Sequence, residues 1–244
     1  MAAGTSPLTQ FEIKPLIPIH LGGLDVSFTN SAAWMTLVVV TVSLFMVLSM
    51  RGHALVPNRL QSISELSYIF IANMVRDNVG PEGRPYFPFI FSIFMFILFG
   101  NMFGMIPYSF TYTSHIIVTF SFAIFIFIGV TLIGIIKHRV RFLTYFMPPG
   151  VPMAMAPLLV PIEIISYLSR PISLSVRLFA NMTAGHTLLK VFAGFVISLG
   201  IMAGWLPLLF VVMLTGLEIV IAFLQAFVFA ILTCLYLNDA IHLH

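Results

Sequence analysis

The sequence predicts an all-α polytopic membrane protein with about five membrane crossings and one interfacial amphipathic helix, ending in a long, steeply tilted antiparallel helix hairpin. Hydrophobic residues make up 60% of the 244 residues and charged residues only 8%, and the mean hydropathy is +1.08. Several apolar runs are long enough to cross a bilayer, and the last two are longer than a bilayer is thick. We predict one membrane domain over residues 1–244.

Residues 1–30 contain prolines and charges but no basic stretch followed by an apolar one. We expect an external N-terminal segment without a cleavable signal peptide. Residues 31–50 carry no charge, and about 20 residues at 1.5 Å each match the roughly 30 Å of the hydrocarbon core. They form the predicted first span.

Residues 58–79 mix apolar and charged side chains at helical spacing, which is typical of a helix lying in the membrane interface. Residues 80–85 predict a turn, and residues 86–136 predict a helical hairpin of two spans. Gly100 and Gly104 have the small-xxx-small spacing that permits close helix packing, and Asn101 between them is expected to be a packing group.

Residues 147–161 hold five prolines and are not expected to form a regular helix, so they predict a broken or re-entrant segment. The helical stretches 162–195 and 208–237 would be roughly 51 Å and 45 Å long at 1.5 Å per residue. Because both exceed the membrane thickness, residues 162–237 predict a steeply tilted hairpin with its tip near Met202.

Basic residues follow the first and third spans, whereas the loop between the second and third spans has none. The positive-inside rule then places these two basic loops in the cytoplasm. Five crossings put the N-terminal segment and the hairpin tip outside and the C-terminal end inside.

Polar and ionisable side chains form a stripe on each helix of the hairpin. The first stripe contains Glu163, Arg170, Ser173, Arg177 and Asn181, and the second contains Glu218, Gln225 and Tyr236. Counting from the tip predicts three shared levels: His186 with Glu218, then Arg177 with Gln225, then Glu163 with Asp239. Arg170 and Lys190 are expected to extend towards opposite membrane faces.

Carboxylates and imidazole can carry protons, but a guanidinium releases none at working pH. We therefore predict that Arg177 is a fixed positive charge between two water-filled half-paths. Protons would then have to cross the membrane on a separate component that itself moves. The alternative for Arg177 is a structural arginine that caps carbonyls or pairs with a buried acid such as Glu218. The alternative for His186 is a hydrogen-bonded core residue.

The run SLSVRLFANMTAGH at residues 173–186, followed by Glu218, Gln225 and LQAFVFAILTCLYLNDAIHLH, resembles subunit a of the rotary F-type ATP synthase. The resemblance covers the whole chain, and the early QFEIKPLIPIH resembles alphaproteobacterial members. It implies a stator subunit that delivers protons to and from the carboxylates of a c-subunit ring, which the 162–237 hairpin would face.

By this resemblance Arg177 blocks direct leakage and interacts with each ring carboxylate. Four residues would line the outer path: Glu218, His186, Asn181 and Gln225. Four would flank the cytoplasmic path: Glu163, Ser173, Tyr236 and Asp239. In many bacterial relatives the pair matching His186 and Glu218 is reversed, and the equal predicted depth of the two positions explains why an exchange is tolerated.

No phosphate-binding loop and no HExxH motif occurs in the sequence, so we expect no catalysis, cofactor or metal. The net charge of +3 lies where membrane topology places it, and we expect no nucleic-acid partner. Implied partners are the c-ring, b-type peripheral stalk subunits, other ATP synthase subunits and lipid, in a bacterial inner membrane or alternatively the mitochondrial inner membrane. The rival function is a self-contained ion channel or secondary transporter, but these often contain an internal repeat, and none is evident.

Overall fold

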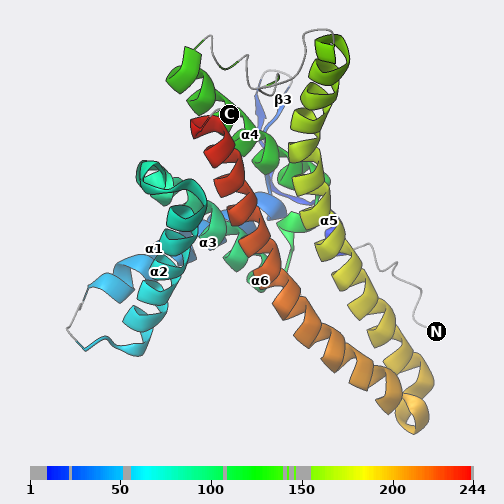
Figure 1. Cartoon of the computed structure of the whole chain (residues 1–244). Coiled ribbons are helices and arrows are strands. Elements are labelled where there is room, and N and C mark those ends of the chain that lie inside the picture. The colour runs from blue at the N-terminus through cyan, green and yellow to red at the C-terminus, as the bar shows by residue number, and fades with distance from the viewer. Residues whose placement is uncertain are drawn as a thin grey trace. The chain divides into compact units, whose positions relative to one another are not determined.

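The computed structural model describes residues 10–21, 24–51, 56–106, 109–139, 142, 146 and 155–242. In this part of the chain five helices are long and apolar enough to cross a membrane, which confirms the predicted all-α polytopic class (Figure 1). They are built on α1 (Asn30–Met50), α3 (Phe87–Gly104), α4 (Ile116–His138), α5 (Ala156–Ala203) and α6 (Trp205–Ile241). The helix α2 (Arg59–Val79) is not among them.

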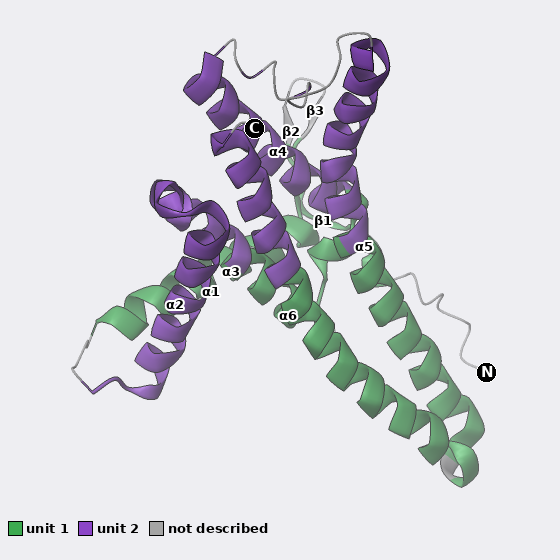
Figure 2. Cartoon of the chain, viewed as in Figure 1, with its two compact units in different colours: residues 1–53, 95–116, 178–226 green, residues 54–94, 117–177, 227–244 purple. Residues whose placement is uncertain are grey.

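The chain divides into two compact units, shown in Figure 2. Unit 1 contains residues 1–53, 95–116 and 178–226, and unit 2 contains residues 54–94, 117–177 and 227–244. The helices α3, α5 and α6 each contribute residues to both units. The single membrane domain over residues 1–244 stays a prediction.

The N-terminal segment of unit 1 contains short strands that the sequence patterns did not predict. The strands β1 (Pro15–Ile17) and β4 (Phe28–Thr29) pair antiparallel, as do β2 (His20–Leu21) and β3 (Leu24–Asp25). The Asn30 side chain accepts a 3.1 Å hydrogen bond from the Lys14 amide and donates one of 3.1 Å to the Glu12 carbonyl. The Thr29 hydroxyl caps α1 by accepting from the Ala32 amide. The segment is thereby tied to the start of α1.

In unit 2, α2 matches the predicted helix over residues 58–79 to within one residue. Gly80 has φ 79°, a left-handed conformation that suits glycine. A 3₁₀ helix, η2 (Pro81–Tyr86), then occupies the predicted turn and leads into α3. Leu60, Ile63 and Leu66 of α2 are exposed, and the interfacial position of this helix stays a prediction.

The first helix of the terminal hairpin begins earlier than the sequence predicted. Because α5 starts at Ala156, the expectation that residues 147–161 form no regular helix is wrong for residues 156–161, whereas residues 147–154 lie outside the described part. Pro157 falls in the first turn, where its missing N–H is not needed. Pro161 and Pro171 lie inside the helix.

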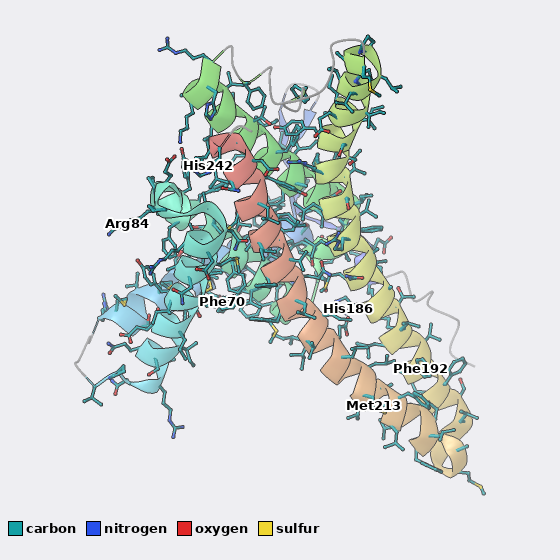
Figure 3. The ribbon with its side chains drawn as sticks, in the orientation of Figure 1. Phe70, Arg84, His186, Phe192, Met213 and His242 are labelled. Atoms are coloured by element: carbon teal, nitrogen blue, oxygen red, sulfur yellow. The ribbon has the colours of Figure 1, made fainter. Side chains whose placement is uncertain are left out.

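The turn of the hairpin lies in unit 1, where residues 178–203 of α5 and 205–226 of α6 run antiparallel (Figure 1). The helical backbone is interrupted at Gly200, with φ 60° and ψ −161°. Met202 is 93% exposed, which confirms the predicted tip. Further along the hairpin from this tip, the Phe192 and Phe210 rings stack with centroids 5.6 Å apart; Figure 3 labels Phe192 on α5. The steep tilt relative to the bilayer stays a prediction.

The loop between α3 and α4 is seated on the glycines of α3. Tyr112, 1% exposed, donates a 3.1 Å hydrogen bond to the Phe96 carbonyl. A Cβ on Gly100 would lie 1.9 Å from the Tyr112 hydroxyl, and a Cβ on Gly104 would lie 2.5 Å from the Thr111 hydroxyl. The small residues that the sequence assigned to helix packing thus make room for the side chains of this loop.

Three segments meet at one end of unit 2. Lys137 at the end of α4 forms an ion pair with Glu82 of η2, and Nε2 of His138 lies 2.9 Å from the Ile241 carbonyl of α6. The contacts bring the end of α4, η2 and the end of α6 together, and their placement on the cytoplasmic side of the membrane stays a prediction.

Replacing Gly100 with alanine should destabilise the fold by about 1–3 kcal/mol, the usual cost of overpacking, because the new methyl group overlaps Tyr112. The control is Gly129→Ala, where nothing lies within 4 Å of the added Cβ. Thermal unfolding of the purified proteins in detergent measures the difference. Equal stability of the two variants would contradict the proposed role of the glycine.

Candidate functional site

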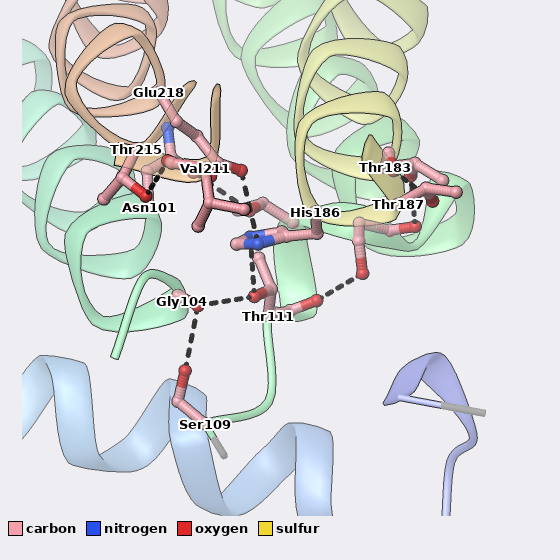
Figure 4. A network of polar contacts seen from close by, with 12 residues as sticks. Asn101, Gly104, Ser109, Thr111, Thr183, His186, Thr187, Val211, Thr215 and Glu218 are labelled. Atoms are coloured by element: carbon pink, nitrogen blue, oxygen red, sulfur yellow. Dashed lines mark hydrogen bonds and ion pairs between the residues drawn. The ribbon is translucent and has the colours of Figure 1, made fainter. Parts of the chain in front are cut away.

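A buried acid–imidazole pair joins α5 and α6 in unit 1. Nδ1 of His186 lies 3.2 Å from Oε1 of Glu218, and the two side chains are 9% and 4% exposed. Figure 4 shows the imidazole reaching from α5 towards the carboxyl group on α6. The contact confirms the partnership predicted from equal spacing about Met202.

Glycine at position 185 allows this close approach. A Cβ there would lie 2.6 Å from Oε1 of Glu218, which is shorter than real Cβ contacts. The carboxyl group therefore packs against α5 at the one position in that turn without a side chain. The sequence placed Gly185 inside the quoted run but assigned it no role.

The loop before α4 supplies a third group that the sequence analysis missed. Oγ1 of Thr111 lies 3.1 Å from Nε2 of His186 and also donates a 3.3 Å hydrogen bond to the Gly104 carbonyl. Thr183 of α5 donates to the Ser114 carbonyl of the same loop at 3.2 Å. The only sequence signal was the run TYTS at residues 111–114, which is polar between two strongly apolar spans.

Asn101 belongs to the same buried region rather than serving only as a packing group. It is 0% exposed, donates a 3.3 Å hydrogen bond to the Ala222 carbonyl, and accepts one of 2.9 Å from Thr113. These bonds tie α3 both to α6 and to the loop within unit 1. They satisfy the amide in a place where an unpaired polar group is costly.

The carboxyl group of Glu218 has hydrogen-bonding capacity left. Within the described residues neither of its oxygens has a hydrogen-bond partner, and the residue is 3% exposed. Burying an ionised carboxylate this way is expensive, and a proton on the carboxyl or on the facing imidazole relieves the cost. The pair can therefore hold and pass a proton over a short distance.

The other residues predicted for the outer path also lie in unit 1. Gln225 is 8% exposed and Asn181 is half-buried. Arg177 belongs to unit 2, so its predicted common level with Gln225 stays a prediction.

A second polar cluster lies in unit 2. Nη1 of Arg170 donates a 2.9 Å hydrogen bond to Oδ2 of Asp239. The guanidinium also lies 5.3 Å from the Tyr167 ring centroid and 5.0 Å from that of Tyr236, within the range of cation–π attraction. Arg170 is therefore held by α6, which offers an acid and a ring one turn apart, and its expected extension towards a membrane face stays a prediction.

The predicted polar stripe on the first helix is divided by these contacts. Arg170 points to α6, whereas Ser173 and Arg177 are exposed, and Glu163 is half-buried. In the part of the chain that the structure describes, Arg177 forms no hydrogen bond or ion pair.

Comparison with known proteins gives a consistent result. The family model described as ATP synthase A chain matches residues 32–238. Proteins named ATP synthase subunit a are similar over nearly the whole length: one from Pelagibacter ubique is 61% identical over 98% of this chain and 99% of its own. One from Parvibaculum lavamentivorans is 61% identical over 97% and 93%, and one from Rhodospirillum rubrum is 57% identical over 98% and 99%.

The Arg170–Asp239 pair should contribute measurably to stability. We expect a double-mutant cycle with Arg170→Gln and Asp239→Asn to give a coupling of about 1 kcal/mol in unfolding free energy, because the half-buried ion pair is reinforced by two aromatic rings. The control cycle uses Lys14 and Glu12, 3.8 Å apart and 71% and 64% exposed, where about 0–0.5 kcal/mol is expected. Zero coupling for the first pair would mean that the contact does not hold α5 to α6.

Proposed function

This chain belongs to the ATP synthase A chain family, and from that premise we propose that it is the stator subunit that carries protons to and from a rotating ring of c subunits. Two offset aqueous half-channels would open to opposite sides of the membrane, with Arg177 blocking a direct route between them. The chain would be a non-catalytic part of ATP synthesis, without a cofactor or metal of its own.

The buried pair in unit 1 supports the outer half-channel. His186 and Glu218 have side chains that can bind and release a proton, and they lie 3.2 Å apart. Asn181 and Gln225 follow on the same two helices and offer amide groups that hydrogen-bond to water. An acid–imidazole pair favours the proton over sodium as the coupling ion.

The exposure of Arg177 is the observation that carries the proposal. Arg177 is exposed on α5, and nearby Ile172 and Val176 are 53% and 42% exposed. An exposed guanidinium costs at least about 2.5 kcal/mol in lipid, but it is stabilised by an acid on a facing partner. A ring of carboxylates that pass one after another supplies that acid without a permanent ion pair.

The second cluster supports an inner half-channel at the cytoplasmic side. Glu163, Ser173, Tyr236 and Asp239 were predicted to flank this path, and all four lie in unit 2. Because Asp239 is bound by Arg170, its charge is compensated, and the half-buried Glu163 is the better proton carrier. Tyr236 then serves as a wall that also holds the Arg170 guanidinium.

The energetics require partners. One charge crossing 100 mV gains about 2.3 kcal/mol, so several protons must be pooled through a rotor to drive one ATP synthesis. We propose the c-ring, b-type peripheral stalk subunits and the remaining ATP synthase subunits as partners, in the bacterial inner membrane, with the mitochondrial inner membrane as the alternative location.

Reconstitution separates this function from that of a self-contained channel. In liposomes with an imposed pH gradient, the purified chain alone should conduct no protons above the level of empty vesicles, because each half-channel ends at the ring. The chain assembled with its c-ring should conduct. Proton flux through the chain alone would favour a channel instead.

Replacing Arg177 with alanine should abolish ATP synthesis coupled to the proton gradient in the assembled complex, because protons would then pass without turning the ring. The control is Arg51→Ala, which removes an exposed arginine at the end of α1 and should leave synthesis near the normal rate. ATP formed by acid-pulsed vesicles measures both. Normal synthesis by the Arg177 variant would refute the assigned role.

A further inference from the structure

We propose that Thr111 is a positioning residue for the His186–Glu218 pair: its hydroxyl fixes the imidazole with Nε2–H towards the loop and Nδ1 towards the carboxyl group, so that one exchangeable proton stays between the two side chains. This inference rests on the proposed proton-carrying function of the pair. It gives a role to the loop between α3 and α4, which contributes no titrating group to the pair itself.

The position of Thr111 is set by its neighbours on the loop. Tyr112 is bonded to the Phe96 carbonyl at 3.1 Å and Thr113 to Asn101 at 2.9 Å. The Ser114 hydroxyl donates to the Thr111 carbonyl at 2.6 Å. A hydroxyl held from both sides in this way can fix the orientation of a ring that is otherwise free to turn about its χ2 bond.

Proton counting then assigns the tautomer. A threonine hydroxyl has one proton, and that of Thr111 is directed to the Gly104 carbonyl at 3.3 Å. The contact of 3.1 Å with His186 must therefore be made by Nε2–H donating to the hydroxyl oxygen. Nδ1 is left to face Oε1 of Glu218 at 3.2 Å.

In this arrangement the pair shares one proton. When the proton is on Glu218, a rotation of the carboxyl group lets its O–H donate to the lone pair of Nδ1 on a neutral imidazole, a bond that Oε1 does not form in the conformation described. When the O–H bond breaks and an Nδ1–H bond forms, a carboxylate faces an imidazolium, and the total charge of the pair is unchanged. The transfer therefore moves charge only across the 3.2 Å gap, which limits its cost in a buried site.

The opposite tautomer is less favourable. With Nδ1–H on a neutral imidazole, Glu218 would accept at Oε1 either as a carboxylate at 3% exposure or as a neutral acid with its O–H on Oε2. Its Oε2 has no protein hydrogen-bond partner among the described residues. An ion or an O–H group buried with so little compensation is costly, so Thr111 stabilises the tautomer that avoids it.

Nitrogen chemical shifts of histidine test the assignment without any transport measurement. In the complex labelled with ¹⁵N-histidine, the His186 signal is identified by its loss in His186→Gln. We expect Nε2 to stay protonated from pH 5 to 9 in the wild type and in Thr111→Ser, which keeps the hydroxyl. Thr111→Val, of the same shape without a donor or acceptor, should give a mixture of both tautomers. An unprotonated Nε2 in the wild type would overturn the proposal.

ATP-driven proton pumping by the reconstituted complex tests the consequence. Thr111→Val should lower the rate about threefold to tenfold, the range of one net hydrogen bond, and should shift the pH profile. Thr111→Ser should restore both. The matched control is Thr187→Val, whose hydroxyl donates to the Thr183 carbonyl of its own helix, as Figure 4 shows. A uniform loss in Thr111→Val without a shifted profile would indicate a packing role and overturn the proposal.

Other titratable groups near the pair must be accounted for in that profile. Lys190 lies one turn beyond His186 on α5, Tyr112 lies on the loop, and His115 follows Ser114. Burial lowers the pKa of His115, so the comparison is repeated in His115→Gln, where the Thr111→Val shift should persist. Disappearance of the shift there would assign it to His115 and overturn the proposal.

A double-mutant cycle separates this inference from the proposed function. If Thr111 acts through the imidazole, Thr111→Val should have no further effect on pumping in His186→Gln. If the proposed function is wrong, Arg177→Ala and His186→Gln will leave coupled ATP synthesis unchanged. If only the role of Thr111 is wrong, those two variants will still lose synthesis while Thr111→Val behaves like Thr187→Val.

Discussion

The constraint on which this structure depends is the absence of water in the bilayer core. Backbone groups there must be bonded internally, which leaves helices as the spanning elements of this chain. Polar side chains within such spans must find partners on neighbouring elements. In unit 1 the amide of Asn101 bonds the Ala222 carbonyl, and in unit 2 Arg170 bonds Asp239. Each polar contact therefore also joins two segments that are distant in the sequence.

Glycines, which have no side chain, make room for buried contacts of this kind. Gly100 and Gly104 admit Tyr112 and Thr111, and Gly185 admits the carboxyl group of Glu218. Glycine inside a helix is usually unfavourable by about 1 kcal/mol relative to alanine. Here the gain is that a loop and a carboxyl group approach the helix backbone closely enough to form a buried polar site.

The features that the sequence could predict are those that depend on the regular geometry of helices. Helices have a fixed rise, so counting residues from a turn placed His186 opposite Glu218 correctly, and uncharged runs located the spans to within a few residues. The contribution of Thr111 could not be found this way, because non-helical backbone has no period from which a position can be computed. The start of α5 was missed for a different reason: prolines argue against a helix interior, yet Pro157 lies in the first turn and Pro161 lies inside the helix.

The two arginines of α5 show why sequence alone does not assign a role to an intramembrane charge. Arg170 and Arg177 lie about two turns apart on the same helix, and both belong to the predicted polar stripe. Asp239 and Tyr236 of α6 satisfy the first within the chain. The second is exposed, with no hydrogen bond or ion pair to the residues described. The difference lies in what each guanidinium faces: α6 holds Arg170, whereas the proposed role of Arg177, to engage and release an external carboxylate, requires a guanidinium that no described residue binds permanently.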